Sequence, residues 1–315
     1  MSRGKSLSMR SLGFVLIGIL LGVFLAGCAS PPEYVAESIA PKPLREDVVE
    51  WSGPGLVPYG VTAQSIRSTY GCTVAYEQYS PKTPASRTAV ILGHGFMRNL
   101  AQTRGWARLW ASRGITVVIP SLCNSTWLDG HHDRNARDMV ALADRVVDMG
   151  VADRIIYAGH SAGGLAALLA AHEDPRAVAY LGLDSVDSGG LTATIRDASR
   201  KYEVPSLILV ADPSGCNADN NILPVLPDSA SISVVRIPFS RHCDFEKPYD
   251  PQCALLCGTV EPLEVAKRVR DTVEVLATAW IELHAGAPER RASVREAIPE
   301  VVRTLRRNGN LRVLE

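Results

Sequence analysis

The chain has 315 residues, of which 46% are hydrophobic, and its 33 basic and 33 acidic side chains give a formal net charge of zero. This much apolar material is enough for one large or two small buried cores. A neutral chain without a nucleic-acid-binding motif has no basic field to attract phosphates, so we expect no nucleic-acid partner.

The N-terminus has the pattern of an export signal. Residues 1–27 carry three basic side chains, no acidic one and an apolar run from Leu12 to Leu25. This run is shorter than the roughly 18–20 residues that a membrane-spanning helix needs, so it predicts a secretory signal peptide, with an uncleaved anchor as the alternative. Without this segment the chain has 30 basic and 33 acidic side chains, a net charge of about −3.

The signal ends in Leu25-Ala26-Gly27-Cys28, which resembles a bacterial lipobox. The resemblance implies cleavage before Cys28, lipid attachment to its sulfur and membrane anchoring of the mature protein. Ala29 differs from the Asp that retains lipoproteins at the inner membrane of enteric-type bacteria. We therefore expect a lipoprotein of the cell envelope, at the outer membrane or cell surface, with residues 28–58 as a Pro-rich and charged tether.

From Tyr59 onward, segments typical of strands and helices alternate, after an initial hairpin that turns at Tyr70-Gly71. Strands are predicted at 59–68, 72–79, 88–93, 115–120, 154–158, 178–183, 206–210 and 231–237, and helices at 99–113, 135–149, 162–172, 191–202 and 262–284. This order predicts an α/β domain over 59–285, with a mostly parallel central sheet and helices on both faces. The C-terminal tail, 286–315, contains an arginine-rich amphipathic pattern at 288–308, which predicts a helix docked on the domain surface.

The most informative motif is Gly159-His160-Ser161-Ala162-Gly163, between an apolar strand and an Ala/Leu-rich helix. Gly-x-Ser-x-Gly in this context predicts a nucleophile elbow, a sharp turn that exposes the serine hydroxyl. The two glycines leave room for the turned backbone. Ser161 is therefore the candidate nucleophile.

A serine nucleophile needs a base, an acid that orients the base, and donors for the oxyanion. After a nucleophile elbow of this kind, the acid and then the histidine base are expected later in the chain. This order favours His242, which follows the last predicted strand. The oxyanion donors are expected at the backbone N–H groups of Phe96, after the strand at 88–93, and Ala162. Two residues could be the acid, because Asp184 and Asp212 each follow a strand and both of their loops are expected to border the last strand.

Three stretches resemble the α/β-hydrolase superfamily, and within it the chlorophyllase and platelet-activating-factor acetylhydrolase-like branch, with a more distant likeness to cutinase-like polyesterases. They are His94-Gly95-Phe96-Met97-Arg98-Asn99, Gly159-His160-Ser161-Ala162-Gly163-Gly164 and Gly182-Leu183-Asp184-Ser185-Val186-Asp187. The third is similar to the Gly-(Ile/Leu)-Asp-Pro-Val segment that carries the acid in chlorophyllase-like enzymes, although Ser185 replaces the proline. The resemblance covers about residues 70–260 and implies the α/β-hydrolase fold with Asp184 as the acid.

Six cysteines follow Cys28, and an even number in an exported protein predicts up to three disulfides. Cys72 and Cys123 are expected to pair, because one opens a hairpin strand and the other follows the strand at 115–120. We expect Cys253, Cys257 or both to hold the His242 loop, by bonding to each other, to Cys243 or to Cys216. Metal binding by cysteines, or by His242 with Asp244 and Glu246, is a less favoured alternative.

These features predict a serine carboxylic ester hydrolase, carboxylesterase- or lipase-like, that acts on a small-molecule or lipid-like ester without a cofactor or metal. Ser161 would form the acyl-enzyme, His242 would act as base and Asp184 would orient it. The protein is expected to be a monomer. The alternatives are an acyltransferase that uses the same triad and a non-catalytic envelope lipoprotein that binds a ligand.

Overall fold

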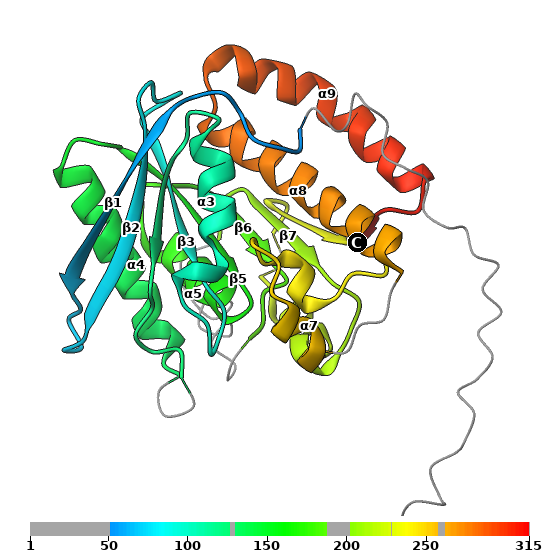
Figure 1. The fold of residues 1–315 in the computed structure, drawn as a ribbon, viewed down its shortest axis with the longest axis horizontal. Coiled ribbons are helices and arrows are strands. Elements are labelled where there is room, and N and C mark those ends of the chain that lie inside the picture. The colour runs from blue at the N-terminus through cyan, green and yellow to red at the C-terminus, as the bar shows by residue number, and fades with distance from the viewer. Residues whose placement is uncertain (1–50, 127–129, 188–201, 228, 258–261, 315) are drawn as a thin grey trace, which may run out of the picture. The chain divides into compact units, whose positions relative to one another are not determined.

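A computed structural model describes residues 51–126, 130–187, 202–227, 229–257 and 262–314 (Figure 1). The predicted signal peptide, Cys28, most of the tether and nearly all of the predicted helix at 191–202 lie outside these ranges. No helix in the described part of the chain combines the length and the hydropathy of a transmembrane segment.

A nine-stranded sheet with the strand order β1-β2-β4-β3-β5-β6-β7-β8-β9 forms the centre of the folded part. The strands are β1 (Tyr59–Arg67), β2 (Thr73–Pro81), β3 (Thr88–Gly93), β4 (Thr116–Pro120), β5 (Arg154–His160), β6 (Ala177–Leu183), β7 (Ser206–Val210), β8 (Ile232–Arg236) and β9 (Arg312–Leu314). The six strands from β4 to β8 in this order pair in parallel, while β1, β2 and β9 pair antiparallel. The predicted α/β class with a mostly parallel sheet is thus confirmed.

Helices cover both faces of the sheet, because the central strands are apolar on both sides. On one face, Ile91 of β3 packs in a cluster with residues of α4 (His132–Asp148) and α5 (Ala162–Glu173). On the other face, Leu92 of β3 belongs to a cluster with residues of α3 (Arg104–Ala111) and α8 (Leu263–Ala285) (Figure 1). Because the strands from β4 to β8 in the sheet order are parallel, their carboxyl ends lie at the same end of the sheet, between the two helical layers.

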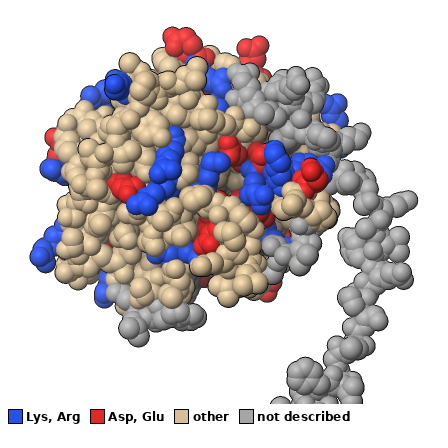
Figure 2. Space-filling view, in the orientation of Figure 1, with Lys and Arg blue, Asp and Glu red and all other residues tan. Residues whose placement is uncertain are grey.

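The C-terminal tail belongs to the same fold. The predicted amphipathic helix is α9 (Pro288–Arg307), which buries Val294, Val301 and Leu305 in the cluster shared with α8. The short strand β9, which the sequence analysis did not predict, adds to the sheet edge at β8. On the face drawn in Figure 2, basic side chains lie among acidic ones.

Residues 51–58, which the sequence analysis assigned to the tether, pack against the folded part. Trp51 is buried, with 4% of its surface exposed. The Gly53 N–H donates to the Glu274 carboxylate of α8, and the Gly55 N–H donates to Ser112 Oγ after α3. The folded part therefore includes Trp51 and does not begin at Tyr59.

Three disulfides link the six described cysteines. The expected pair Cys72–Cys123 joins the start of β2 to the segment after β4. The short helix α7 (Pro251–Cys257), which was not predicted, carries the other two bonds: Cys243–Cys253 and Cys216–Cys257. Both Cys253 and Cys257 thus hold the region that follows His242, within the alternatives that the sequence left open.

Candidate active site

The candidate nucleophile lies at the turn from β5 to α5. Ser161 has φ 56° and ψ −129°, a conformation that is strained for a residue with a side chain. A Cβ added at Gly159 would lie 2.2 Å from the Gly163 carbonyl oxygen, and one added at Gly163 would lie 2.2 Å from the His94 carbonyl oxygen. Both glycines of the motif are therefore required by close backbone approach, as the elbow pattern predicts.

His242 and Asp184 are in direct contact. His242 begins a short 3₁₀ helix, η4 (His242–Phe245), after β8, and its Nδ1 lies 2.6 Å from Asp184 Oδ2. Asp184 directly follows β6, has φ 46° and is fully buried. Since the carboxylate is buried against the imidazole, it favours the tautomer that carries a proton on Nδ1 and leaves Nε2 as the proton acceptor.

The segment after β7 supports the Asp184 carboxylate. Asp184 Oδ1 accepts a hydrogen bond from the Ala211 N–H at 2.8 Å. The buried side-chain amide of Asn217 donates to Oδ2 at 3.2 Å. These donors give hydrogen-bond partners to a carboxylate that would be costly to bury without them.

Asp212, the other candidate acid, has a different partner. Its Oδ2 accepts from the backbone N–H of Phe239 at 2.7 Å. Phe239 has φ 64° and lies three residues before His242, so Asp212 holds the start of the segment that carries the base.

The segment from His94 to Arg98 lies over the nucleophile. A Cβ added at Gly95 would be 3.0 Å from Ser161 Cβ, so this segment approaches the elbow closely. His94 fixes it at two points: its Nδ1 donates to the Gly95 carbonyl at 2.8 Å, and its Nε2 accepts from the Leu122 N–H at 2.9 Å. Burial lowers the pKa of His94 to about 4, so the ring is neutral at pH 7 and can play both parts.

Next to this segment are the candidate oxyanion donors. Ala162 is the first residue of α5, where a backbone N–H has no partner within the helix and the helix dipole favours negative charge. Phe96 follows Gly95, and the next residue, Met97, donates its N–H to the Ser125 carbonyl at 2.7 Å. The structure thus brings the sequence-predicted Phe96, Ala162 and Ser161 into one region.

The carboxylates of Asp244 and Glu246, which follow His242, form hydrogen bonds with other groups of the protein. Asp244 Oδ2 accepts from the Arg241 N–H at 2.8 Å. Glu246 Oε1 accepts from Arg98 Nε at 2.9 Å, and Arg98 also pairs with Asp250. Arg98 lies in a stretch that the sequence singled out, but the sequence analysis did not identify its pairing with Glu246.

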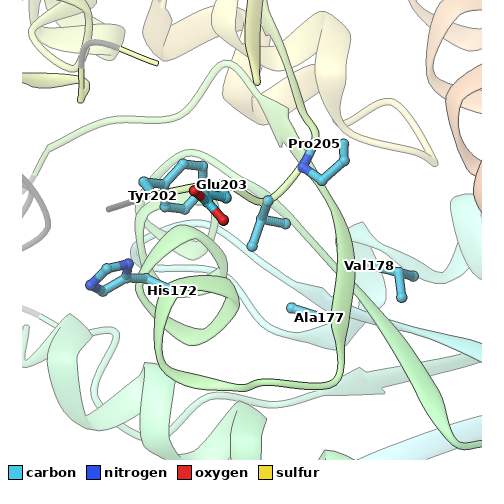
Figure 3. A pocket seen from close by; sticks show the side chains of 7 residues that line it. His172, Ala177, Val178, Tyr202, Glu203 and Pro205 are labelled. Carbon is cyan, nitrogen blue, oxygen red and sulfur yellow. The ribbon is translucent and has the colours of Figure 1, made fainter. Parts of the chain in front are cut away.

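A separate hollow lies away from this site. It is lined by His172, Ala177, Val178, Tyr202, Glu203, Val204 and Pro205 (Figure 3). Most of these residues lie at the amino ends of β6 and β7, and His172 lies near the carboxyl end of α5. Ser161 and Asp184, in contrast, follow the carboxyl ends of β5 and β6. The hollow is therefore at the opposite edge of the sheet.

A serine at a strained turn, an imidazole held by a buried carboxylate and N–H groups beside the serine are the parts that nucleophilic catalysis requires. All of these groups come from segments at the carboxyl ends of the parallel strands. No protein-family model and no curated protein sequence matches this chain.

Proposed function

We propose that this protein is a serine carboxylic ester hydrolase with the α/β-hydrolase fold. The observation that carries the proposal is the 2.6 Å contact between His242 Nδ1 and Asp184 Oδ2. Ser161 has the elbow conformation, and its N–H donates to the carbonyl of Leu183, the residue before Asp184, at 3.1 Å. The chain order of serine, acid and histidine is the one expected of this fold.

In the proposed mechanism, Ser161 Oγ attacks the ester carbonyl carbon while His242 Nε2 accepts the hydroxyl proton. The backbone N–H groups of Phe96 and Ala162 stabilise the negative charge that develops on the carbonyl oxygen. The imidazolium then gives its proton to the leaving alkoxide, and the alcohol departs. The acyl group remains on Ser161.

Water completes the cycle. His242 takes a proton from a water molecule, the resulting hydroxide attacks the acyl carbon, and the acid leaves as Ser161 regains its proton. Throughout, Asp184 remains ionised and stabilises the imidazolium. The reaction needs only water as co-substrate, so we propose no cofactor or metal.

We further propose that the enzyme acts in the bacterial cell envelope as a monomer anchored through lipid on Cys28. This part rests on the signal-like residues 1–27 and the Leu-Ala-Gly-Cys ending. A membrane-held enzyme would meet lipid-like as well as small soluble esters.

The test is hydrolysis of p-nitrophenyl esters of increasing acyl length by the wild type and by Ser161→Ala. We expect wild-type turnover that the substitution reduces by several orders of magnitude, with an unchanged circular dichroism spectrum. Turnover that rises when an alcohol is added, with ester as the product, would favour an acyltransferase. Tight ester binding without turnover would favour a binding protein and contradict the proposal.

A further inference from the structure

The residue directly before the proposed nucleophile lies between two catalytic segments. His160 Nε2 donates to the main-chain carbonyl of His242 at 3.0 Å. The two imidazole rings pack with centroids 4.5 Å apart. On its other side, a Cβ added at Gly95 would approach His160 Nδ1 to 3.2 Å. His160 thus contacts both the segment of the base and the segment of the oxyanion donors.

The protonation of His160 follows from its surroundings. The side chain is almost fully buried, and burial together with the nearby His242 keeps the pKa of His160 well below its usual value. A neutral ring that donates from Nε2 has an unprotonated Nδ1. That Nδ1 lies 3.7 Å from Glu246 Oε1.

Glu246 is in turn tied to Arg98. Its carboxylate is 1% exposed and pairs with Arg98 Nε at 2.9 Å, while Arg98 Nη1 reaches Asp250 at 3.1 Å. Arg98 belongs to the oxyanion segment, and Glu246 and Asp250 belong to the segment after His242. The contact between Arg98 and Glu246 therefore joins the two segments close to His160.

We propose that His160 is a positioning residue that holds the main chain of His242, and that the Arg98–Glu246 pair holds the oxyanion segment in register with it. Asp184 fixes only the Nδ1 edge of the imidazole, so a fixed main chain is also needed to aim Nε2 at Ser161. The inference rests on the proposed function, since it assigns His242 as the base.

Two substitutions of His160 separate positioning from simple packing. His160→Phe keeps an aromatic ring beside His242 but removes the donor, whereas His160→Gln places an amide N–H near the position of Nε2. Because misplacement by about 1 Å can cost about 10²-fold in rate, we expect His160→Phe to lower kcat by about 10- to 100-fold with KM changed less than about threefold. His160→Gln should recover kcat to within about fivefold of the wild type.

A third variant tests the positioning role if the substitutions of the buried His160 prevent folding. Arg98→Met removes the contacts of Arg98 with Glu246 and Asp250 at a partly exposed position, and we expect it to lower kcat by about 3- to 10-fold. Each variant is compared at equal concentrations of folded protein, measured by circular dichroism and thermal unfolding.

The outcomes distinguish this inference from the proposed function. Loss of kcat in His160→Phe and its recovery in His160→Gln would support the positioning role. If His160→Phe folds and has the same kcat as the wild type, the positioning role is overturned and the enzyme assignment stays intact. If His160→Phe does not fold, an Arg98→Met variant with the same kcat as the wild type has the same consequence. If the wild-type protein does not hydrolyse esters, or if its turnover survives in Ser161→Ala, the proposed function is overturned, and the inference with it.

Discussion

Asp184 Oδ2 lies 2.6 Å from His242 Nδ1, and the other oxygen of the same carboxylate accepts from the Ala211 N–H. The acid thus links the segment that follows β7 to the segment that follows β8. Through Asp184, the carboxyl ends of the central strands are in direct contact with the proposed base, His242.

Replacing Asp184 by Asn should be far more damaging than the same change at Asp212. An amide at 184 no longer supports the required tautomer or the imidazolium, so we expect kcat to fall by about 10⁴-fold. Asp212→Asn keeps an oxygen that can accept from the Phe239 N–H, so we expect a loss within about tenfold. Steady-state kinetics of both variants on one p-nitrophenyl ester make the comparison. A larger loss at Asp212 would reverse the assignment of the acid.

Two disulfides should differ in what they stabilise. Cys72–Cys123 closes a loop with a sequence separation of 51 and Cys243–Cys253 one of 10. The chain-entropy estimate gives about 4 kcal/mol for the longer loop and about 3 kcal/mol for the shorter one. However, Cys243 directly follows His242, so loss of the shorter bond should disturb the base.

We therefore expect Cys72→Ser/Cys123→Ser to lower the free energy of unfolding more, and Cys243→Ser/Cys253→Ser to lower kcat more. Urea unfolding and ester turnover, measured on the same preparations, test this ranking. The opposite order for kcat would show that the bond beside His242 does not support the site.

Glu246 should make stability depend on pH near neutrality. Burial raises its pKa to about 7, against the smaller opposing effects of Arg98 and His242, while Asp250 raises it further. A carboxyl group whose pKa is raised by folding stabilises the fold when it is protonated, and this stability is lost as the pH rises through 7.

Relative to Glu246→Gln, the wild type should thus lose roughly 3 kcal/mol of unfolding free energy between pH 4.5 and pH 8. Chemical unfolding of both proteins at several pH values measures the difference. A constant difference across this range would mean that Glu246 has the same pKa in the folded and unfolded chain.

The sequence predicted the central sheet and the elbow because both have local patterns. The apolar strand before Ser161 and the glycines around it are readable without tertiary information. The strand β9 and helix α7 were missed because each is short, with no periodic apolar pattern. Trp51, a large aromatic residue in a Pro-rich region, was the available sign that the folded part begins before Tyr59.

The sequence could not choose between Asp184 and Asp212 without the resemblance, because both follow strands that end at the same sheet edge. Their partners decide the geometry, and these come from distant parts of the chain: Asn217 for Asp184 and Phe239 for Asp212. Likewise, the link between Arg98 and Glu246 spans 148 residues and has no local pattern.

The central claim is that Ser161 is a nucleophile activated by His242. The most direct measurement is covalent labelling of the intact protein by a fluorophosphonate, followed by peptide mass spectrometry to locate the adduct. We predict one adduct per chain on Ser161, its absence in Ser161→Ala and labelling slowed by orders of magnitude in His242→Ala. Absence of labelling in the folded wild type, or an adduct that persists at another serine in Ser161→Ala, would contradict the claim.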